Sequence, residues 1–213
     1  MGATCAQRIL ERGLADVALV DVAEGLAEGK ALDLAEASPL EGHDGKITGS
    51  TEYEIIRGAQ VVVVTAGMAR KPGMARGDLL EANAKIVSSI LPRAAAAAPR
   101  AILLVVTNPL DAMTYLAWKV TGWPAERVMG MAGVLDSARL RFFVAERLRV
   151  SAKEVQALVL GGHGDSMVPV VASTTVAGEP LLKFLPATEV EKLFLRARDG
   201  GAEVVQLLKS GSA

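Results

Sequence analysis

Short apolar runs rich in β-branched residues alternate along this chain with longer segments in which apolar residues recur at helical spacing. The runs lie at residues 17–20, 61–65 and 102–106. Because strands that alternate with helices form parallel sheets with helices on their faces, the alternation predicts an α/β fold. The helical spacing predicts helices at about residues 2–13, 23–37, 78–98, 110–121, 135–149 and 188–209, with a break permitted at Gly200 and Gly201.

The run from Gln60 to Gly67 is apolar on both faces, which is typical of a strand that helices cover on each side. We therefore expect this strand in the centre of the sheet. After about residue 150 the pattern changes to strand-like segments at residues 155–160 and 167–176, separated by a glycine-rich turn. This change predicts that a second domain begins in this part of the chain.

Charge and composition argue against several classes of partner and site. The 23 Lys and Arg residues nearly balance the 24 Asp and Glu residues, so we expect no nucleic-acid partner. The longest apolar runs, such as residues 101–106, are too short to span a membrane. The single cysteine, Cys5, cannot form an internal disulfide, which fits a reducing, cytoplasmic location. No Cys or His pair has metal-ligand spacing, so we expect no metal site.

Gly2 and Asp21 match two positions of a dinucleotide-binding motif. Gly2 opens a predicted helix, and Asp21 follows the next predicted strand, 19 residues later. In a G-x-G-x-x-G turn the last glycine lets helix and strand pack closely, and an acid about 20 positions further on binds the ribose hydroxyls. The strand and the first two glycines of the motif are absent before Met1. Taken alone, the pair is therefore better explained as an ordinary helix start and strand end.

A glycine-rich loop with two arginines, Arg70 and Arg76, follows the apolar run that ends near Thr65. The loop would lie at the carboxyl end of a strand, where open α/β sheets bind ligands. A guanidinium group presents a planar fork of donors that matches a carboxylate, so two arginines suit a dianionic substrate. A solvated basic loop is the alternative interpretation.

Three further polar motifs follow along the chain. Asn108 comes after the strand at residues 102–106, within a Thr-Asn-Pro sequence. Asp136 and Arg139 are three positions apart on a predicted helix, so they project from one face. His163 stands between glycines, and histidine suits a group that takes and returns a proton near neutral pH. Taken singly, these motifs are better explained as a turn, a surface ion pair and a hydrogen-bonded turn histidine, respectively.

Taken in order, the motifs resemble the lactate and malate dehydrogenase family, and the similarity covers essentially the whole chain. The ordered set is specific where each motif alone is not. The resemblance implies a Rossmann-type doubly wound parallel sheet followed by the start of an α+β substrate domain. It assigns residues 1–133 to NAD binding and residues 134–213 to a catalytic domain.

The resemblance also implies roles for the polar residues. His163 would donate and accept the proton of the reaction, with Asp136 as its carboxylate partner. Arg139 would bind the substrate carboxylate next to the reacting carbon, Arg76 would polarise the carbonyl group, and Asn108 would contact substrate and cofactor.

Arg70 decides the expected substrate. By the resemblance, lactate dehydrogenases have an uncharged residue at this position, whereas an arginine pairs with the second carboxylate of malate. We therefore expect reversible oxidation of (S)-malate to oxaloacetate with NAD, which Asp21 favours over NADP because a carboxylate repels the additional phosphate. The alternatives are a lactate or other 2-hydroxy-acid dehydrogenase and a noncatalytic nucleotide-binding fragment. The retained catalytic set argues against the fragment.

The family comparison further implies which residues bind the cofactor and which parts are missing. The first strand of the sheet and the C-terminal part of the second domain are absent, so we expect residues 1–213 made alone to fold poorly and to have little activity. We expect the full-length protein to form a homodimer or homotetramer, with the helix at residues 23–37 as one contact. The implied cofactor-binding residues are Gly2, Asp21, Thr65, Ala66, Gly67, Asn83, Val106 and Asn108.

Overall fold

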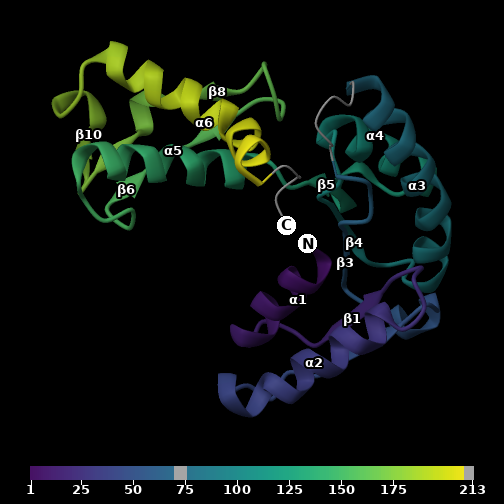
Figure 1. The fold of residues 1–213 in the computed structure, drawn as a ribbon. Coiled ribbons are helices and arrows are strands. Elements are labelled where there is room, and N and C mark those ends of the chain that lie inside the picture. The colour runs from purple at the N-terminus through teal and green to yellow at the C-terminus, as the bar shows by residue number, and fades with distance from the viewer. Residues whose placement is uncertain (70–75, 209–213) are drawn as a thin grey trace.

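The computed structural model describes residues 1–69 and 76–208, and these residues form two lobes (Figure 1). The N-terminal lobe is built from alternating helices and parallel strands, as the sequence pattern predicts. Its elements are α1 (Gly2–Glu11), β1 (Val17–Val20), α2 (Leu26–Glu41), β2 (Ile47–Ser50), a 3-10 helix (Tyr53–Ile56), β3 (Val61–Val64), α3 (Arg76–Ala97), β4 (Ile102–Val105), α4 (Leu110–Thr121), a 3-10 helix (Ala125–Arg127) and β5 (Val128–Gly130).

The parallel strands are divided between two sheets. β1 pairs with β2, while β3, β4 and β5 form a three-stranded sheet in that order. The α/β prediction is confirmed, but the expectation of a central β3 is wrong, because β3 lies at an edge and Val61 is 52% exposed. Among the described residues, no strand lies between β1 and β3. An apolar run reflects what covers the two faces of a strand, and this does not fix the strand order.

α2 runs further than its local sequence predicts, and α6 lacks the break that its sequence permits. α2 continues past Pro39 to Glu41 and ends at Gly42, which adopts a left-handed conformation with φ of 71°. α6 (Ala187–Leu208) passes through Gly200 and Gly201 without a break. Gly200 is buried against the side chains of α5 (Gly133–Leu148), so packing outweighs the low helix propensity of glycine.

In the C-terminal lobe, α5 and α6 pack together beside short antiparallel strands (Figure 1). The strand predicted at residues 155–160 is split into β6 and β7, and the strand predicted at residues 167–176 is split into β8 and β9. β6 pairs with β9, whereas β7 pairs with β8. A 3-10 helix separates β8 from β9, so the second predicted strand could not run straight. The remaining elements are β6 (Val155–Gln156), β7 (Val159–Leu160), β8 (Val168–Pro169), a 3-10 helix (Val171–Ser173), β9 (Thr175–Val176), β10 (Glu179–Pro180) and a 3-10 helix (Leu181–Lys183).

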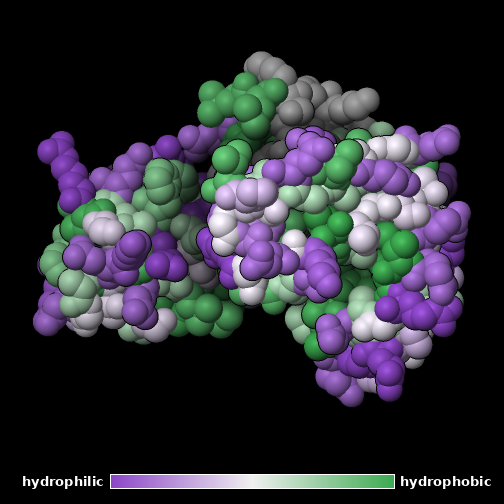
Figure 2. All heavy atoms as spheres, turned by 90° about the horizontal axis from the view of Figure 1, so that it is seen from below, coloured by the Kyte–Doolittle hydropathy of each residue, from purple (hydrophilic) through white to green (hydrophobic). Residues whose placement is uncertain are grey.

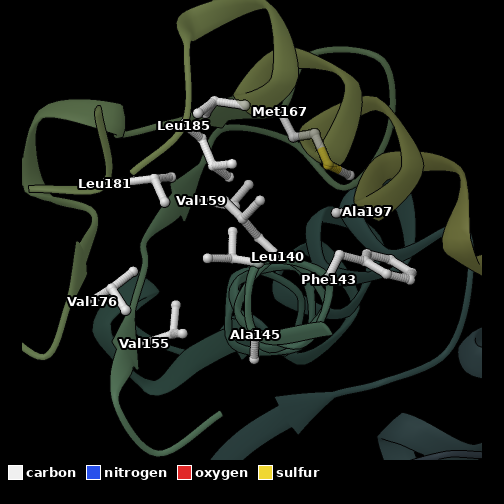
Figure 3. Close-up of a cluster of buried hydrophobic side chains, with 12 residues drawn as sticks. Leu140, Phe143, Ala145, Val155, Val159, Met167, Val176, Leu181, Leu185 and Ala197 are labelled. Atoms are coloured by element: carbon white, nitrogen blue, oxygen red, sulfur yellow. The ribbon is translucent and has the colours of Figure 1, made fainter. Parts of the chain in front are cut away.

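Each lobe has its own apolar core. In the C-terminal lobe, Leu140 and Phe143 of α5 face Val155, Val159 and Ala197 (Figure 3). In the N-terminal lobe, the inner residues of β3 and β4 pack against α3 and α4. These cores fix the ends of the strands and the first turns of the helices, which carry the predicted site residues.

Some apolar side chains remain on the surface. On the face shown in Figure 2, hydrophobic residues reach the surface in several patches among hydrophilic ones. Leu32 and Leu40 of α2 are exposed, as are Val134 and Phe142 of α5. Within residues 1–69 and 76–208, no helix combines the length and the apolar character needed to cross a membrane.

Candidate active site

His163 and Asp136 form a hydrogen-bonded pair in the C-terminal lobe. Nδ1 of His163 lies 2.9 Å from Oδ2 of Asp136, which occupies the first turn of α5. Asp136 is only 2% exposed, and the dipole of the helix stabilises an anion in its first turn. An ionised carboxylate accepts the Nδ1 proton, which leaves Nε2 as the ring nitrogen that can exchange a proton with a ligand.

Arg139 contacts the other oxygen of the same carboxylate. Its Nη1 atom lies 3.4 Å from Oδ1 of Asp136, one helical turn away. Gly200 of α6 allows that helix to approach the arginine closely: a Cβ atom there would lie 3.3 Å from Cδ of Arg139, whereas one at Gly201 would make an ordinary contact of 3.5 Å with Nη2. The guanidinium group is therefore held between α5 and α6, next to the partner of His163.

The carboxyl ends of β3 and β4 lie side by side because the two strands are parallel neighbours. Oγ1 of the buried Thr107 donates a hydrogen bond of 2.7 Å to the carbonyl oxygen of Ala66 and so links the two ends. A Cβ atom at Gly67 would lie 2.6 Å from Cγ2 of Thr107, so a larger residue would push the ends apart. This edge brings together the predicted cofactor residues Thr65, Ala66, Gly67, Val106 and Asn108.

Asn83 is fully buried beneath this edge. Its Oδ1 atom accepts a hydrogen bond of 2.7 Å from the N–H of Met68, and its Nδ2 atom donates one of 2.6 Å to the carbonyl oxygen of Asn108. Nδ2 also donates to the carbonyl oxygen of Met68 at 3.2 Å. The side chain therefore fastens the backbone beyond β3 to the backbone beyond β4, and its predicted role in cofactor binding stays a prediction.

The start of α1 adjoins the end of β3. A Cβ atom at Gly2 would lie 3.0 Å from Oγ1 of Thr65, so glycine permits the close approach that the dinucleotide motif requires. α1 has neither a side-chain cap nor an acidic residue in its first turn, and such a helix end attracts an anion. Asp21 follows β1 and accepts a hydrogen bond of 3.0 Å from the N–H of Ala23, which orients its carboxylate. The arrangement fits the phosphates and a ribose of a dinucleotide.

Only part of the arginine loop lies within the described residues. Arg70 lies outside the described residues, and Arg76 is the first residue of α3. The roles that the sequence predicts for both arginines therefore stay predictions. Across the two described segments, no group of three or more His, Cys, Asp and Glu residues could hold a metal ion.

Sequence reasoning missed one residue of the site. Oδ2 of Asp111, in the first turn of α4, accepts a hydrogen bond of 3.0 Å from the backbone N–H of His163. An acid in the first turn of a helix is ordinarily explained by the helix dipole, so its sequence position offered no signal. Motif spacing could not predict this contact, because the two residues are 52 positions apart in the sequence.

Comparisons with known proteins agree with this geometry. The model for the lactate/malate dehydrogenase NAD binding domain matches residues 1–130, and the model for the lactate/malate dehydrogenase alpha/beta C-terminal domain matches residues 133–213. The malate dehydrogenase of Chloroherpeton thalassium is 53% identical, over 100% of this chain and 69% of the relative. That of a Nostoc species is 54% identical, over 100% of this chain and 66% of the relative. The chain spans about two thirds of the length of these relatives.

Solved structures show the same likeness. The malate dehydrogenase of Salinibacter ruber superimposes with a TM-score of 0.92 at 41% identity, over 100% of this chain and 68% of that one. The lactate dehydrogenase of Cryptosporidium parvum, complexed with lactic acid and NAD, has a TM-score of 0.93 at 39% identity, over 100% of this chain and 68% of that one. The family and the Rossmann-type fold predicted from the sequence are confirmed: the chain belongs to the lactate/malate dehydrogenase family.

Proposed function

We propose that the protein to which this chain belongs is an NAD-dependent malate dehydrogenase, which reversibly oxidises (S)-malate to oxaloacetate. The observation that carries the proposal is the Asp136 carboxylate, which contacts His163 through one oxygen and Arg139 through the other. Oxidation of a 2-hydroxy acid needs a proton acceptor at the hydroxyl group and a cation at the adjacent carboxylate. The two groups on Asp136 supply these requirements side by side.

The chemistry then follows from the charges of the site. When malate is oxidised, Nε2 of neutral His163 accepts the hydroxyl proton, and Asp136 stabilises the imidazolium that forms. Arg139 binds the substrate carboxylate next to the reacting carbon with two parallel donors. Bound NAD supplies the nicotinamide C4 that accepts the hydride from C2 of malate. In the reverse direction, protonated His163 returns the proton to the carbonyl oxygen of oxaloacetate.

The cofactor assignment rests on the edge formed by α1, β1, β3 and β4. We assign the phosphates to the start of α1 at Gly2, the adenosine ribose to Asp21, and the nicotinamide half to the backbone around Gly67 and Asn108. Asn83 would hold that backbone in place. The domain boundary falls in this proposal between residues 133 and 134, at the start of α5.

Arg70 and Arg76 complete the proposed substrate site. Arg76 would polarise the reacting carbonyl, and Arg70 would bind the second carboxylate of the dicarboxylate. Lactate dehydrogenases are among the similar structures, so oxidation of lactate is the second candidate. Pyruvate and lactate lack a second carboxylate and would leave the guanidinium group without its proposed partner, which is why Arg70 supports malate.

We also propose a cytoplasmic location and a homodimeric or homotetrameric assembly. The location is supported by the single cysteine, because an oxidising compartment usually selects for disulfides. The assembly is supported by exposed apolar side chains on α2 and α5, including Leu32, Leu40 and Phe142. Sedimentation velocity of the full-length protein tests the assembly.

The test of the function uses the full-length product of the gene that encodes these residues. NADH oxidation is measured with oxaloacetate and with pyruvate, first for the parent protein and then for Arg70→Gln. We expect a strong preference for oxaloacetate that the substitution reduces by at least about 100-fold. A parent protein that prefers pyruvate would identify a lactate dehydrogenase, and failure to bind NAD would leave a noncatalytic relative.

A further inference from the structure

Two carboxylates from different lobes hold His163. Asp136 of α5 accepts a hydrogen bond from the imidazole ring, and Asp111 of α4 accepts one from the backbone N–H of the same residue. The first contact orients the ring, and the second fixes the backbone from which the ring projects. Because α4 belongs to the N-terminal lobe, the second contact ties the His163 loop to the lobe that carries the cofactor residues.

The packing around Gly162 is consistent with a specific contact at Asp111. A Cβ atom at Gly162 would lie 2.8 Å from Oδ2 of Asp111 and 2.6 Å from Oγ of Ser166. A side chain at position 162 would therefore displace the Asp111 carboxylate or the Ser166 hydroxyl group from its present position. This steric requirement is a separate observation from the hydrogen bond of 3.0 Å, and it points to the same contact.

Asp111 also lies close in sequence to the strand edge where the cofactor is assigned. It lies three positions after Asn108, which ends the strand edge where the nicotinamide half of the cofactor is assigned. α4 begins at Leu110, so Asp111 is held by the first helical turn directly after that edge. The hydrogen bond that the N–H of His163 donates to this turn therefore sets the distance between the proposed proton-transfer group and the strand edge.

We propose that Asp111 is a positioning residue, which places His163 relative to the cofactor-binding edge through its backbone N–H. The proposal rests on the proposed function, because His163 needs such placement only if it exchanges a proton with substrate. Without the contact the loop can shift, and a displacement of about 1 Å between reacting groups costs about 100-fold in rate. Asp111 touches neither substrate nor cofactor in this role.

The competing explanation is that Asp111 only stabilises α4 through the helix dipole. Asp111→Ala removes both the charge and the acceptor, whereas Asp111→Asn removes the charge but keeps an oxygen that can accept the N–H of His163. Glu28→Ala is the matched control, because it removes the exposed first-turn acid of α2 without touching the site.

The kinetic experiment measures kcat and KM of the full-length protein and of these variants. We expect Asp111→Ala to lower kcat for malate oxidation by about 10- to 100-fold and to leave KM for NAD within about twofold. Asp111→Asn should restore most of the loss, and Glu28→Ala should match the parent. Equal losses in Asp111→Ala and Asp111→Asn, or an unchanged kcat in Asp111→Ala, overturn the proposal.

A second readout does not require activity. Hydrogen–deuterium exchange of the peptide that contains His163 should become at least about tenfold faster in Asp111→Ala and in Gly162→Ala, but not in Asp111→Asn. Unchanged exchange in Asp111→Ala overturns the contact itself. If the parent protein does not oxidise malate and exchange nevertheless responds as expected, the proposed function fails while the contact stands.

Discussion

Replacement of Asp136 by asparagine tests the pair on which the proposed mechanism depends. The carboxylate accepts the Nδ1 proton of His163 at 2.9 Å and is almost completely buried. A carboxamide of the same shape carries no charge, and it can turn its NH₂ group toward Nδ1. In that orientation the ring must accept at Nδ1 and carry its proton on Nε2, which then cannot take the hydroxyl proton of malate.

The magnitude follows from the geometry. At 2.9 Å, and with an effective dielectric constant of about 20, an imidazolium and a carboxylate attract each other by about 6 kcal/mol. The side chain of His163 is 20% exposed, so solvent screens part of this attraction. If about half remains, the transition state loses about 3 kcal/mol, and kcat for malate oxidation falls by about 100-fold.

The assay follows NADH formation by the full-length protein, with Asp44→Asn as a control that makes the same chemical change at an exposed site. Thermal unfolding of both variants separates a loss of rate from a loss of folded protein. A kcat for Asp136→Asn within about threefold of the parent value would refute the reasoning, because the imidazolium would then not depend on its buried partner.

Three other predictions concern stability. Leu140→Ala should reduce the free energy of unfolding by about 2 to 5 kcal/mol in urea denaturation, whereas Leu182→Ala, at an exposed position, should change it little. Asn83→Ala removes the hydrogen-bond partner of the N–H and carbonyl groups of Met68 and of the carbonyl group of Asn108. The free energy of unfolding should fall by about 1 to 3 kcal/mol for each of these groups that water does not reach. An unchanged free energy of unfolding in urea would contradict the buried network. The hydrogen bond from Arg196 lowers the pKa of Glu203, so this stabilisation is present above the unfolded-state pKa and is lost as the pH falls through the lowered pKa. Glu203→Gln should therefore lower the melting temperature by about 1 to 3 °C at neutral pH and by nothing at a pH below both values, as measured by calorimetry.

Sequence patterns predicted those features of the fold that repeat locally. Alternating strand-like and helical segments predicted the α/β lobe, and all six predicted helices form. The position of β3 in the strand order could not be predicted in this way, because strand pairing depends on segments that are distant in the sequence. The same limit explains the split strands of the C-terminal lobe, where β6 and β7 are close in sequence yet pair with different strands.

The same distinction between local and distant contacts applies to the predicted site. His163 and Asp136 lie 27 positions apart, and only the ordered motifs of a family indicated that they would meet, as the structure shows. Spacing alone predicted the Asp136 and Arg139 contact, because residues three apart on a helix share a face. Asn83 was predicted to bind cofactor, but nothing in its neighbours along the chain indicated that its side chain would be buried against the backbone of two other segments.

Asp136 makes His163 and Arg139 a single unit rather than two independent groups. One oxygen contacts the ring that would exchange the proton, and the other faces the cation that would bind the substrate carboxylate. A movement of this buried carboxylate would therefore disturb both contacts together, and in the proposed mechanism both contacts set the position of the substrate carbon relative to the ring. Because Gly200 of α6 packs against the side chain of Arg139, helix packing supports one side of the unit. In the proposed mechanism, the geometry of proton transfer thus depends on the contact between α5 and α6 as well as on His163.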